Sequence, residues 1–210
     1  PRCGWRATDA TASYLRGRGQ SVEIIDASAE GYSPTDVAKI VCEDFEPVLV
    51  VIVVYGFQPS SSTQTMPAAG ETARAIKELE PNTKIMMTGT HPAALPGRTM
   101  AEFDIDFVCS GEGPRTITQT VLYLKAGRKM DMNIPDLYYW QSPGNKKQIG
   151  AIGMKTPPGE LIEDLDAAMP GGAWDLLPMQ KYRAHNWHAF DHIDSRSPYV
   201  SIHTSLGCPY

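Results

Sequence analysis

The stretch VLVVIVVYGFQPSSSTQ, residues 48–64, decides the fold. Seven apolar residues open it, five of them valine, and glycine, proline and small hydroxyl residues follow at once. Such a run, rich in β-branched residues and bounded by turn signals, is typical of a strand buried on both faces of a parallel sheet. A buried helix is the alternative, but the run is short for one and glycine ends it. Because ligands bind beyond the carboxyl ends of parallel strands, residues 55–64 are the first candidate for a site.

Strand and helix patterns alternate around this run through the first 130 residues. The sequence Ser33-Pro34-Thr35-Asp36 gives the clearest helix start, with a serine cap, a proline in the first turn and an acid near the positive end. We expect strands at residues 21–27, 48–54, 84–88 and 105–109, and helices at 8–18, 33–45, 65–79, 99–103 and 114–127. This alternation predicts an α/β fold with a doubly wound parallel sheet and helices on both faces.

Three loops are expected to meet at the carboxyl edge of this sheet: residues 55–64, 88–98 and 110–116. Glycine in each allows a ligand to approach the backbone, and Gly111-Glu112-Gly113 precedes a helix that starts with proline, a place that favours anions. Neither G-x-G-x-x-G nor a Walker loop is present, which argues against dinucleotides and ATP. Tight turns alone are the alternative for each loop taken singly.

Histidines and cysteines give weaker signals. His91 could face a ligand or cap the next helix, and the structural role is favoured. His185, His188 and His192 have no partner motif that fixes a metal geometry, so a polar interdomain segment is the preferred interpretation.

The four cysteines, Cys3, Cys42, Cys109 and Cys208, are scattered, which indicates a reducing cytoplasm and not a disulfide framework. Cys42 and Cys109 fit small core residues.

Bulk composition excludes some classes of function. The net charge of −5 and the lack of a Lys/Arg cluster argue against a nucleic-acid surface. No apolar run approaches the roughly 20 residues of a membrane span, and no signal-peptide pattern occurs.

The second part of the chain has a different character. Residues 136–149 are typical of a small hairpin, residues 155–183 of an ordered linker rich in proline and glycine, and residues 197–204 of a further strand. Both ends interrupt a pattern, so we expect a fragment of a longer protein whose first sheet strand is truncated. The strand at 21–27 should then lack its neighbour, leaving a gap or a re-paired edge.

Five segments together resemble a known family, the cobalamin-binding radical S-adenosylmethionine (SAM) enzymes. TGTHPAALPGRT is similar to the family's GG-x-H-x-x-x-x-P loop, and CSGEGPRT to its G-E-G-E-x-T. IEDLDAAMPGGAWDLLP resembles the family's linker, and YVSIHTSLGCPY resembles S-R-G-C-P-x-x-C-x-F-C, the entry to the radical SAM barrel. With YGFQPSSSTQ at the first loop, the order and spacing cover nearly the whole chain.

The resemblance implies a flavodoxin-like (Rossmann-like) cobalamin-binding domain at residues 1–130, a hairpin and linker at 131–196, and the first strand of a radical SAM (β/α) barrel at 197–210. In the family, C-x3-C-x2-C holds a [4Fe-4S] cluster whose remaining iron binds SAM. Cys208 would be the first of those ligands, with the others beyond Tyr210. The D-x-H-x-x-G signature of an axial cobalamin ligand is absent, and His91 is not a substitute for it.

By this resemblance, the parent protein is a radical SAM enzyme, inactive as this fragment alone, that methylates an unactivated carbon. Ring cyclisation, as in anaerobic porphyrin-ester cyclases, and a cobalamin- or flavin-binding module without catalysis remain alternatives. A small-molecule substrate, a reductant such as flavodoxin or ferredoxin, and a cytoplasmic location are the implied context. The implied cobalamin-binding residues are Tyr55, Gln58, Ser60, Ser61, Ser62, Thr88, Gly89, Thr90, His91, Ser110, Gly111, Glu112 and Gly113.

Overall fold

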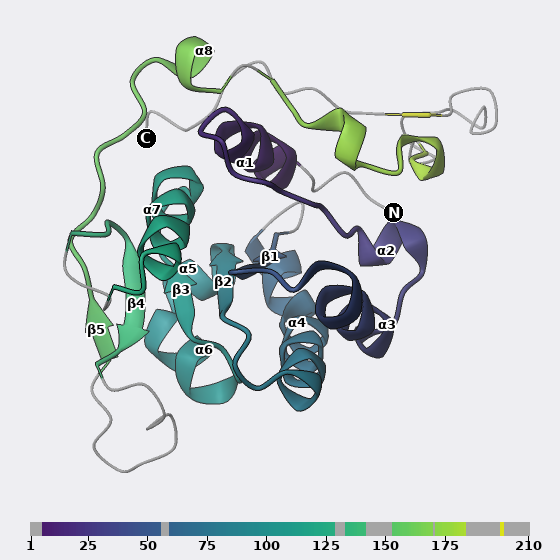
Figure 1. Cartoon of the computed structure of the whole chain (residues 1–210), viewed down its shortest axis with the longest axis horizontal. Helices are drawn as coiled ribbons and strands as arrows, with labels where there is room; N and C mark the ends of the chain where they lie inside the picture. The colour runs from purple at the N-terminus through teal and green to yellow at the C-terminus, as the bar shows by residue number, and fades with distance from the viewer. Residues whose placement is uncertain are drawn as a thin grey trace.

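The valine-rich run forms the first strand of a five-stranded sheet in the computed structural model (Figure 1). The structure describes residues 6–55, 59–128, 133–141, 153–169, 171–183 and 198–199. The strands lie in the order β1-β2-β3-β4-β5. Their bounds are β1 (Val50–Val54), β2 (Ile85–Gly89), β3 (Phe107–Cys109), β4 (Leu137–Trp140) and β5 (Gly153–Lys155). The first three are parallel, as predicted, and the last two are antiparallel to their neighbours.

Helices cover both faces of the sheet, so the doubly wound α/β prediction is confirmed. Successive side chains of β2 point to opposite faces of the sheet. Met86 packs with Leu15 and Ile117 in the hydrophobic cluster on one face. Ile85 and Met87 belong to a second hydrophobic cluster on the other face. The longer helices are α1 (Arg6–Arg16), α3 (Pro34–Lys39), α4 (Pro59–Leu79), α6 (Pro96–Glu102) and α7 (Pro114–Lys125). Shorter ones are α2 (Ala27–Glu30), α5 (Thr90–Ala94), α8 (Leu165–Ala168), the π-helix η1 (Ile40–Phe45), and the 3-10 helices η2 (Trp174–Leu176) and η3 (Met179–Lys181).

The predicted helix start at Ser33 is confirmed by the hydrogen bonds of this residue. The Ser33 hydroxyl accepts a hydrogen bond from the Asp36 amide at 3.2 Å, and the Asp36 carboxylate accepts one from the Ser33 amide at 2.9 Å. This capping box satisfies two amides that a helix terminus leaves without partners.

The strand predicted at residues 21–27 is not formed. Residues 20–26 have no strand pairing, and α2 begins at Ala27. A strand needs a neighbour, and β1 pairs only with β2 among the described strands. β1 is therefore half-buried over most of its length, whereas we expected burial on both faces and β2 has it throughout. This arrangement agrees with the gap that we expected beside residues 21–27.

Helix α4 begins six residues earlier than the predicted residue 65. The start near Thr65 was expected because Pro59 and the serines that follow it were assigned to a loop. In the structure Pro67 lies inside the helix, and the serines expected in a loop form its first turns. The loop expected at 88–98 is likewise mostly helical, since it holds α5 and the start of α6, which begins at Pro96 and not at Thr99.

The predicted hairpin exists, but its second arm lies later in the chain. β4 pairs antiparallel with β5, so Tyr138 faces Lys155. The second arm was expected at residues 146–150, which lie outside the described residues. β4 also adds to the edge of β3, and its fully buried Leu137 joins the core on the α1 and α7 side.

The predicted linker packs back on the domain. Ala173, Leu177 and Tyr182 are buried, and Arg16 forms a salt bridge with Asp175 at 2.7 Å. The Tyr182 hydroxyl donates to the Asp26 carboxylate at 2.7 Å, and the same carboxylate caps α2 by accepting from the Ala29 amide at 2.8 Å. Burial raises the pKa of Asp26, and these hydrogen bonds partly oppose it.

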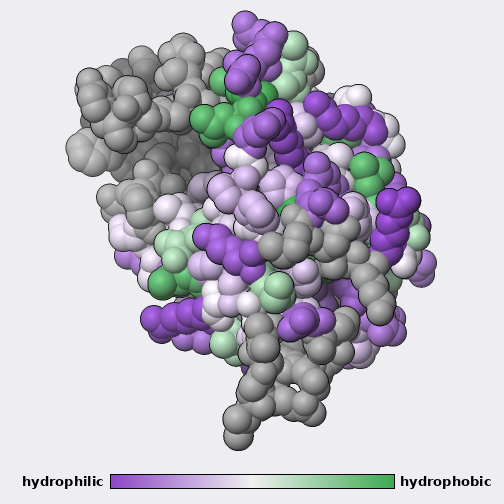
Figure 2. All heavy atoms as spheres, turned by 90° about the vertical axis from the view of Figure 1, so that its left-hand side faces the viewer, coloured by the Kyte–Doolittle hydropathy of each residue, from purple (hydrophilic) through white to green (hydrophobic). Residues whose placement is uncertain are grey.

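Hydrophilic side chains predominate on the face that carries β4, β5 and α7, among the residues coloured in Figure 2. Within the described part of the chain, none of the helices combines the length and apolarity that a membrane crossing requires.

The Tyr182–Asp26 bond gives a test of linker docking. The pKa of Asp26 is raised above 3.8 in the folded protein, so its carboxyl group ionises less readily there than in the unfolded chain. The free energy of unfolding therefore falls as pH rises through the folded-state pKa. Tyr182→Phe removes a donor to the carboxylate and raises that pKa further. We expect a loss of about 1.5–3 kcal/mol in unfolding free energy at pH 7 and a smaller loss at pH 4, measured by urea unfolding. Tyr32→Phe, at a side chain 40% exposed, is the control. Equal losses at both pH values would contradict the assignment.

Candidate functional site

The three predicted loops meet at one edge of the sheet, as expected. Val54 at the end of β1 is in register with Gly89 at the end of β2, and Thr88 is in register with Cys109 at the end of β3. The segments that follow these strands therefore emerge side by side.

At Gly89 this edge leaves no room for a side chain. The φ of this glycine is +134°, a conformation that residues with a side chain rarely adopt, and a Cβ built there would overlap the Val54 backbone carbonyl. The glycine thus lets the chain turn from β2 directly into α5 while lying against β1.

The buried side chain of Ser62 joins the first two loops. Its side chain is fully buried, its hydroxyl donates to the Val54 carbonyl, and it accepts from the His91 amide at 3.0 Å. Ser62 therefore ties the end of β1, the start of α4 and α5 together. Its neighbours differ: Ser60 is exposed and Ser61 is half-buried.

The side chain of His91 is held by a residue that the sequence did not single out. The Thr63 hydroxyl lies 2.9 Å from His91 Nδ1. Thr63 is exposed and His91 is half-buried, so this pair lies at the surface of the edge.

The third loop is fixed by Asp136, which the sequence analysis also missed. The Asp136 carbonyl accepts from the Ser110 amide at 2.8 Å and from the Ser110 hydroxyl at 3.1 Å. A Cβ at Gly111 would overlap the Asp136 carboxylate, which also accepts from the Gly159 amide at 2.9 Å. Asp136 has φ +52°, and no local sequence pattern marks a contact made across 26 residues. The loop, the hairpin and the linker are thereby joined.

Tyr55 and Cys109 are the titratable groups whose pKa values shift at this edge. Burial raises the pKa of Tyr55, and the neighbouring Cys109 and Glu112 raise it further. Burial also raises the pKa of the Cys109 thiol, while the Gly111 backbone and the Thr116 and Thr88 hydroxyls partly oppose the shift. The thiol is fully buried, which confirms its prediction as a core residue.

Two predicted site residues, Gln58 and Cys208, lie outside the described residues, as do His185, His188 and His192 of the expected interdomain segment. Within the described ranges, no group of three or more His, Cys, Asp or Glu side chains could hold a metal ion.

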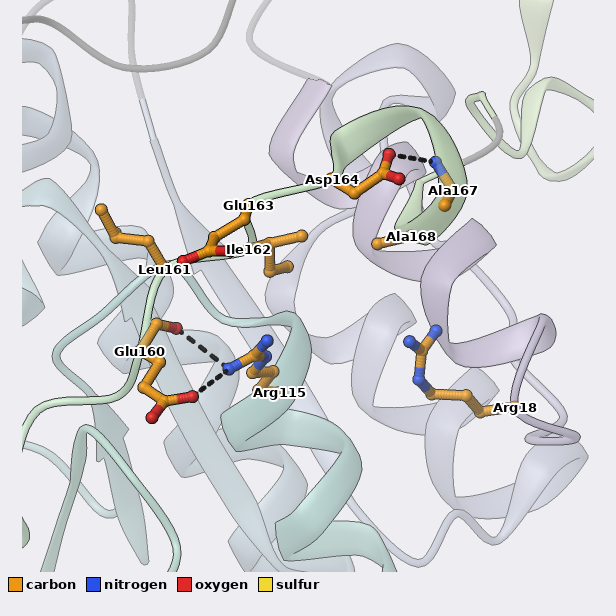
Figure 3. Close-up of a pocket in the computed structure, with 9 residues that line it drawn as sticks. All are labelled: Arg18, Arg115, Glu160, Leu161, Ile162, Glu163, Asp164, Ala167 and Ala168. Atoms are coloured by element: carbon orange, nitrogen blue, oxygen red, sulfur yellow. Dashed lines mark hydrogen bonds and ion pairs between the residues drawn. The ribbon is translucent and has the colours of Figure 1, made fainter.

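A groove lies beside α7, and Arg115 of the third loop is one of the residues that line it (Figure 3). This groove has a volume of about 660 Å³. Arg115 at the start of α7 donates to the Glu160 carbonyl at 3.2 Å, and Arg18 lies on another side of the groove. Three carboxylates, Glu160, Glu163 and Asp164, outnumber the two arginines, so the charge balance does not favour an anionic ligand.

Comparison with known proteins decides the family. Residues 4–121 match the B12 binding domain model, which is more than half of the chain. The chain belongs to the B12-binding domain family.

The chain spans about a third of the length of the curated relative that it matches. It is 34% identical over 200 residues to an "Uncharacterized methyltransferase PH0819" from Pyrococcus horikoshii, covering 95% of this chain and 37% of that protein. The fold is similar to that of TsrM from Kitasatospora setae, a radical S-adenosylmethionine methyltransferase solved with cobalamin and a [4Fe-4S] cluster. The TM-score is 0.59 at 20% identity, over 78% of this chain and 28% of TsrM. A second TsrM structure, with tryptophan and a SAM analogue, gives a TM-score of 0.53 at 20% identity, over 76% of this chain and 28% of that one.

The strand-end edge suits the cofactor that gives the B12-binding domain its name. Cobalamin is large, and its rim carries amide groups that both donate and accept hydrogen bonds. Small residues leave room there, and neutral hydroxyls supply matching partners. The predicted binding residues differ in how far they are exposed. Four are buried: Ser62, Thr88, Gly89 and Gly113. Those that are half-buried are Tyr55, Ser61, Thr90, His91, Ser110 and Gly111, and those that are exposed are Ser60 and Glu112. The buried members shape the edge, and the others are accessible to a ligand.

Gly89→Ala tests the close passage at this edge. The added methyl group would overlap the Val54 carbonyl in a backbone conformation that itself costs about 1–3 kcal/mol. We expect a loss of at least about 2 kcal/mol in unfolding free energy, measured by thermal or urea unfolding. Gly17→Ala is the matched control, because a Cβ there makes only ordinary contacts, the nearest at 3.5 Å. Equal stability of the two variants would show that the edge is not built in this way.

Proposed function

We propose that this chain is the cobalamin-binding part of a radical SAM enzyme that transfers a methyl group to an unactivated carbon. The observation that carries the proposal is the agreement between two findings. The family match spans residues 4–121, and the same residues build the edge where three glycine-containing loops meet. The relation to a methyltransferase over 95% of the chain supports the reaction class.

The accessible residues of the edge would hold cobalamin. Ser60, Ser61 and Thr90 offer hydroxyls, and Ser110 and Glu112 border the third loop. Gly111 and Gly113 add no side chains to that loop. When bound, cobalamin supplies a cobalt-carried methyl group for transfer. The protein's own task is to bind it, fix its orientation and limit access of water.

Cys208 would be the first ligand of the [4Fe-4S] cluster, in the segment that resembles the entry to the radical SAM barrel. Thiolates are the usual ligands of such clusters. The cluster would bind SAM and receive an electron from a reductant such as flavodoxin or ferredoxin, in the cytoplasm. The remaining ligands are expected at the fourth and seventh positions after Cys208.

Anaerobic reconstitution of the full-length protein tests this function. We expect corrin absorption after incubation with cobalamin, and iron and sulfide in the ratio of a [4Fe-4S] cluster. Cys208→Ala should lose the cluster signal and methyl transfer from SAM but keep cobalamin, since the two cofactors use different residues. Cys42→Ala, at a half-buried helical cysteine, is the control and should keep both.

Other outcomes distinguish the alternatives. A protein that takes up no cobalamin would contradict the role of the sheet edge. Cobalamin without a cluster would indicate a binding module, and a cyclised product without methyl transfer would indicate a cyclase.

A further inference from the structure

Two adjacent hydroxyl residues of α4 bind the same histidine in different ways. Ser62 accepts from the backbone amide of His91 at 3.0 Å and is fully buried. Thr63 bonds the imidazole at Nδ1, 2.9 Å away, and is exposed. One residue thus fixes the backbone of His91 and the next fixes its ring.

The Thr63 hydroxyl differs from those of comparable helical threonines. Thr65, Thr72 and Thr99 donate to carbonyls about one turn earlier in their own helices, as hydroxyls in helices often do. In the structure, the Thr63 hydroxyl is instead paired with a side chain 28 residues away. This makes the Thr63–His91 contact a specific tertiary interaction.

Stability does not account for this contact. Hydrogen bonds at an exposed position exchange readily with water and add little to folding free energy. The buried Ser62 already joins α4 to α5. A bond at Nδ1 does, however, hold the plane of the imidazole ring, whichever of the two partners donates. Nε2 of His91 then remains as the ring nitrogen without a hydrogen-bond partner among the described residues.

We propose that Thr63 is a positioning residue, which holds the imidazole of His91 so that Nε2 makes a hydrogen bond to an amide side chain of bound cobalamin. The proposal rests on the proposed function, since it requires cobalamin at this edge. It adds a residue outside the predicted set and gives His91 a role other than axial ligation. Thr63 itself need not touch the cofactor.

Cobalamin titration of the full-length protein, followed by absorption, tests the contact. Thr63→Val keeps the branched shape and removes the hydroxyl, and we expect it to weaken binding about threefold to tenfold, the effect of one hydrogen bond. Thr63→Ser should restore affinity to within about twofold of wild type. Thr72→Val, on the same helix, is the control and should bind as wild type does.

A double-mutant cycle separates positioning from direct contact. If Thr63 acts through His91, Thr63→Val should have no further effect in a His91→Ala background. A second readout does not need cobalamin: ring nitrogen NMR of ¹⁵N-histidine-labelled protein, with His91 assigned from the His91→Ala spectrum. Loss of the hydroxyl should shift the Nδ1 resonance of His91 in Thr63→Val, whereas Thr63→Ser should keep the wild-type shift.

Each contrary result is distinct. Unchanged affinity in Thr63→Val, or an equal loss in both backgrounds, would overturn the positioning role while leaving the proposed function intact. An unchanged Nδ1 resonance of His91 in Thr63→Val would show that the hydroxyl does not bond the ring, and would also overturn the positioning role. Wild-type protein that binds no cobalamin would overturn the proposed function and, with it, the contact to His91 Nε2.

Discussion

The buried hydroxyl of Ser62 is the interaction on which the strand-end edge depends. It joins the Val54 carbonyl, at the end of a parallel strand, to the His91 amide at the start of α5. Both are backbone groups that would otherwise lie buried near a strand end, where unpaired polar groups are costly. Gly89 makes this arrangement possible, because no side chain separates β2 from the Val54 carbonyl. The positions of the first two loops follow from this single bridge.

The third loop is held by Asp136, which stands immediately before β4. Asp136 accepts from Ser110 and from Gly159, so it links the loop to the linker. Further along, Tyr182 binds the buried Asp26 carboxylate. The linker is therefore fixed to the domain near its beginning and near its end. Asp136 thus takes part both in docking the linker and in shaping the candidate site.

Local patterns predicted what depends on local chemistry. The Ser33 cap and the glycine after β2 follow from rules that act within a few residues. The role of Ser62 could not be predicted, because three consecutive serines look alike until the start of the helix fixes which one faces inward. Asp136 acts through contacts 23 to 26 residues apart, which no short motif encodes. The missing strand at residues 21–27 has the same cause, since a strand depends on its neighbour as well as on its own sequence.

The chemistry of the edge favours a neutral, amide-rich ligand over a polyphosphate. Residues 55–64, 88–98 and 110–116 contain two basic residues, Arg98 and Arg115, and these pair with Glu102 and Glu160. Glu112 is exposed in the third loop. Phosphate sites in proteins usually combine helix ends with lysine or arginine. Here the accessible groups are hydroxyls and one imidazole, which pair well with amides because they both donate and accept. An orienting bond such as that from Thr63 to His91 matters most in this setting, since recognition by neutral groups depends on direction and not on charge.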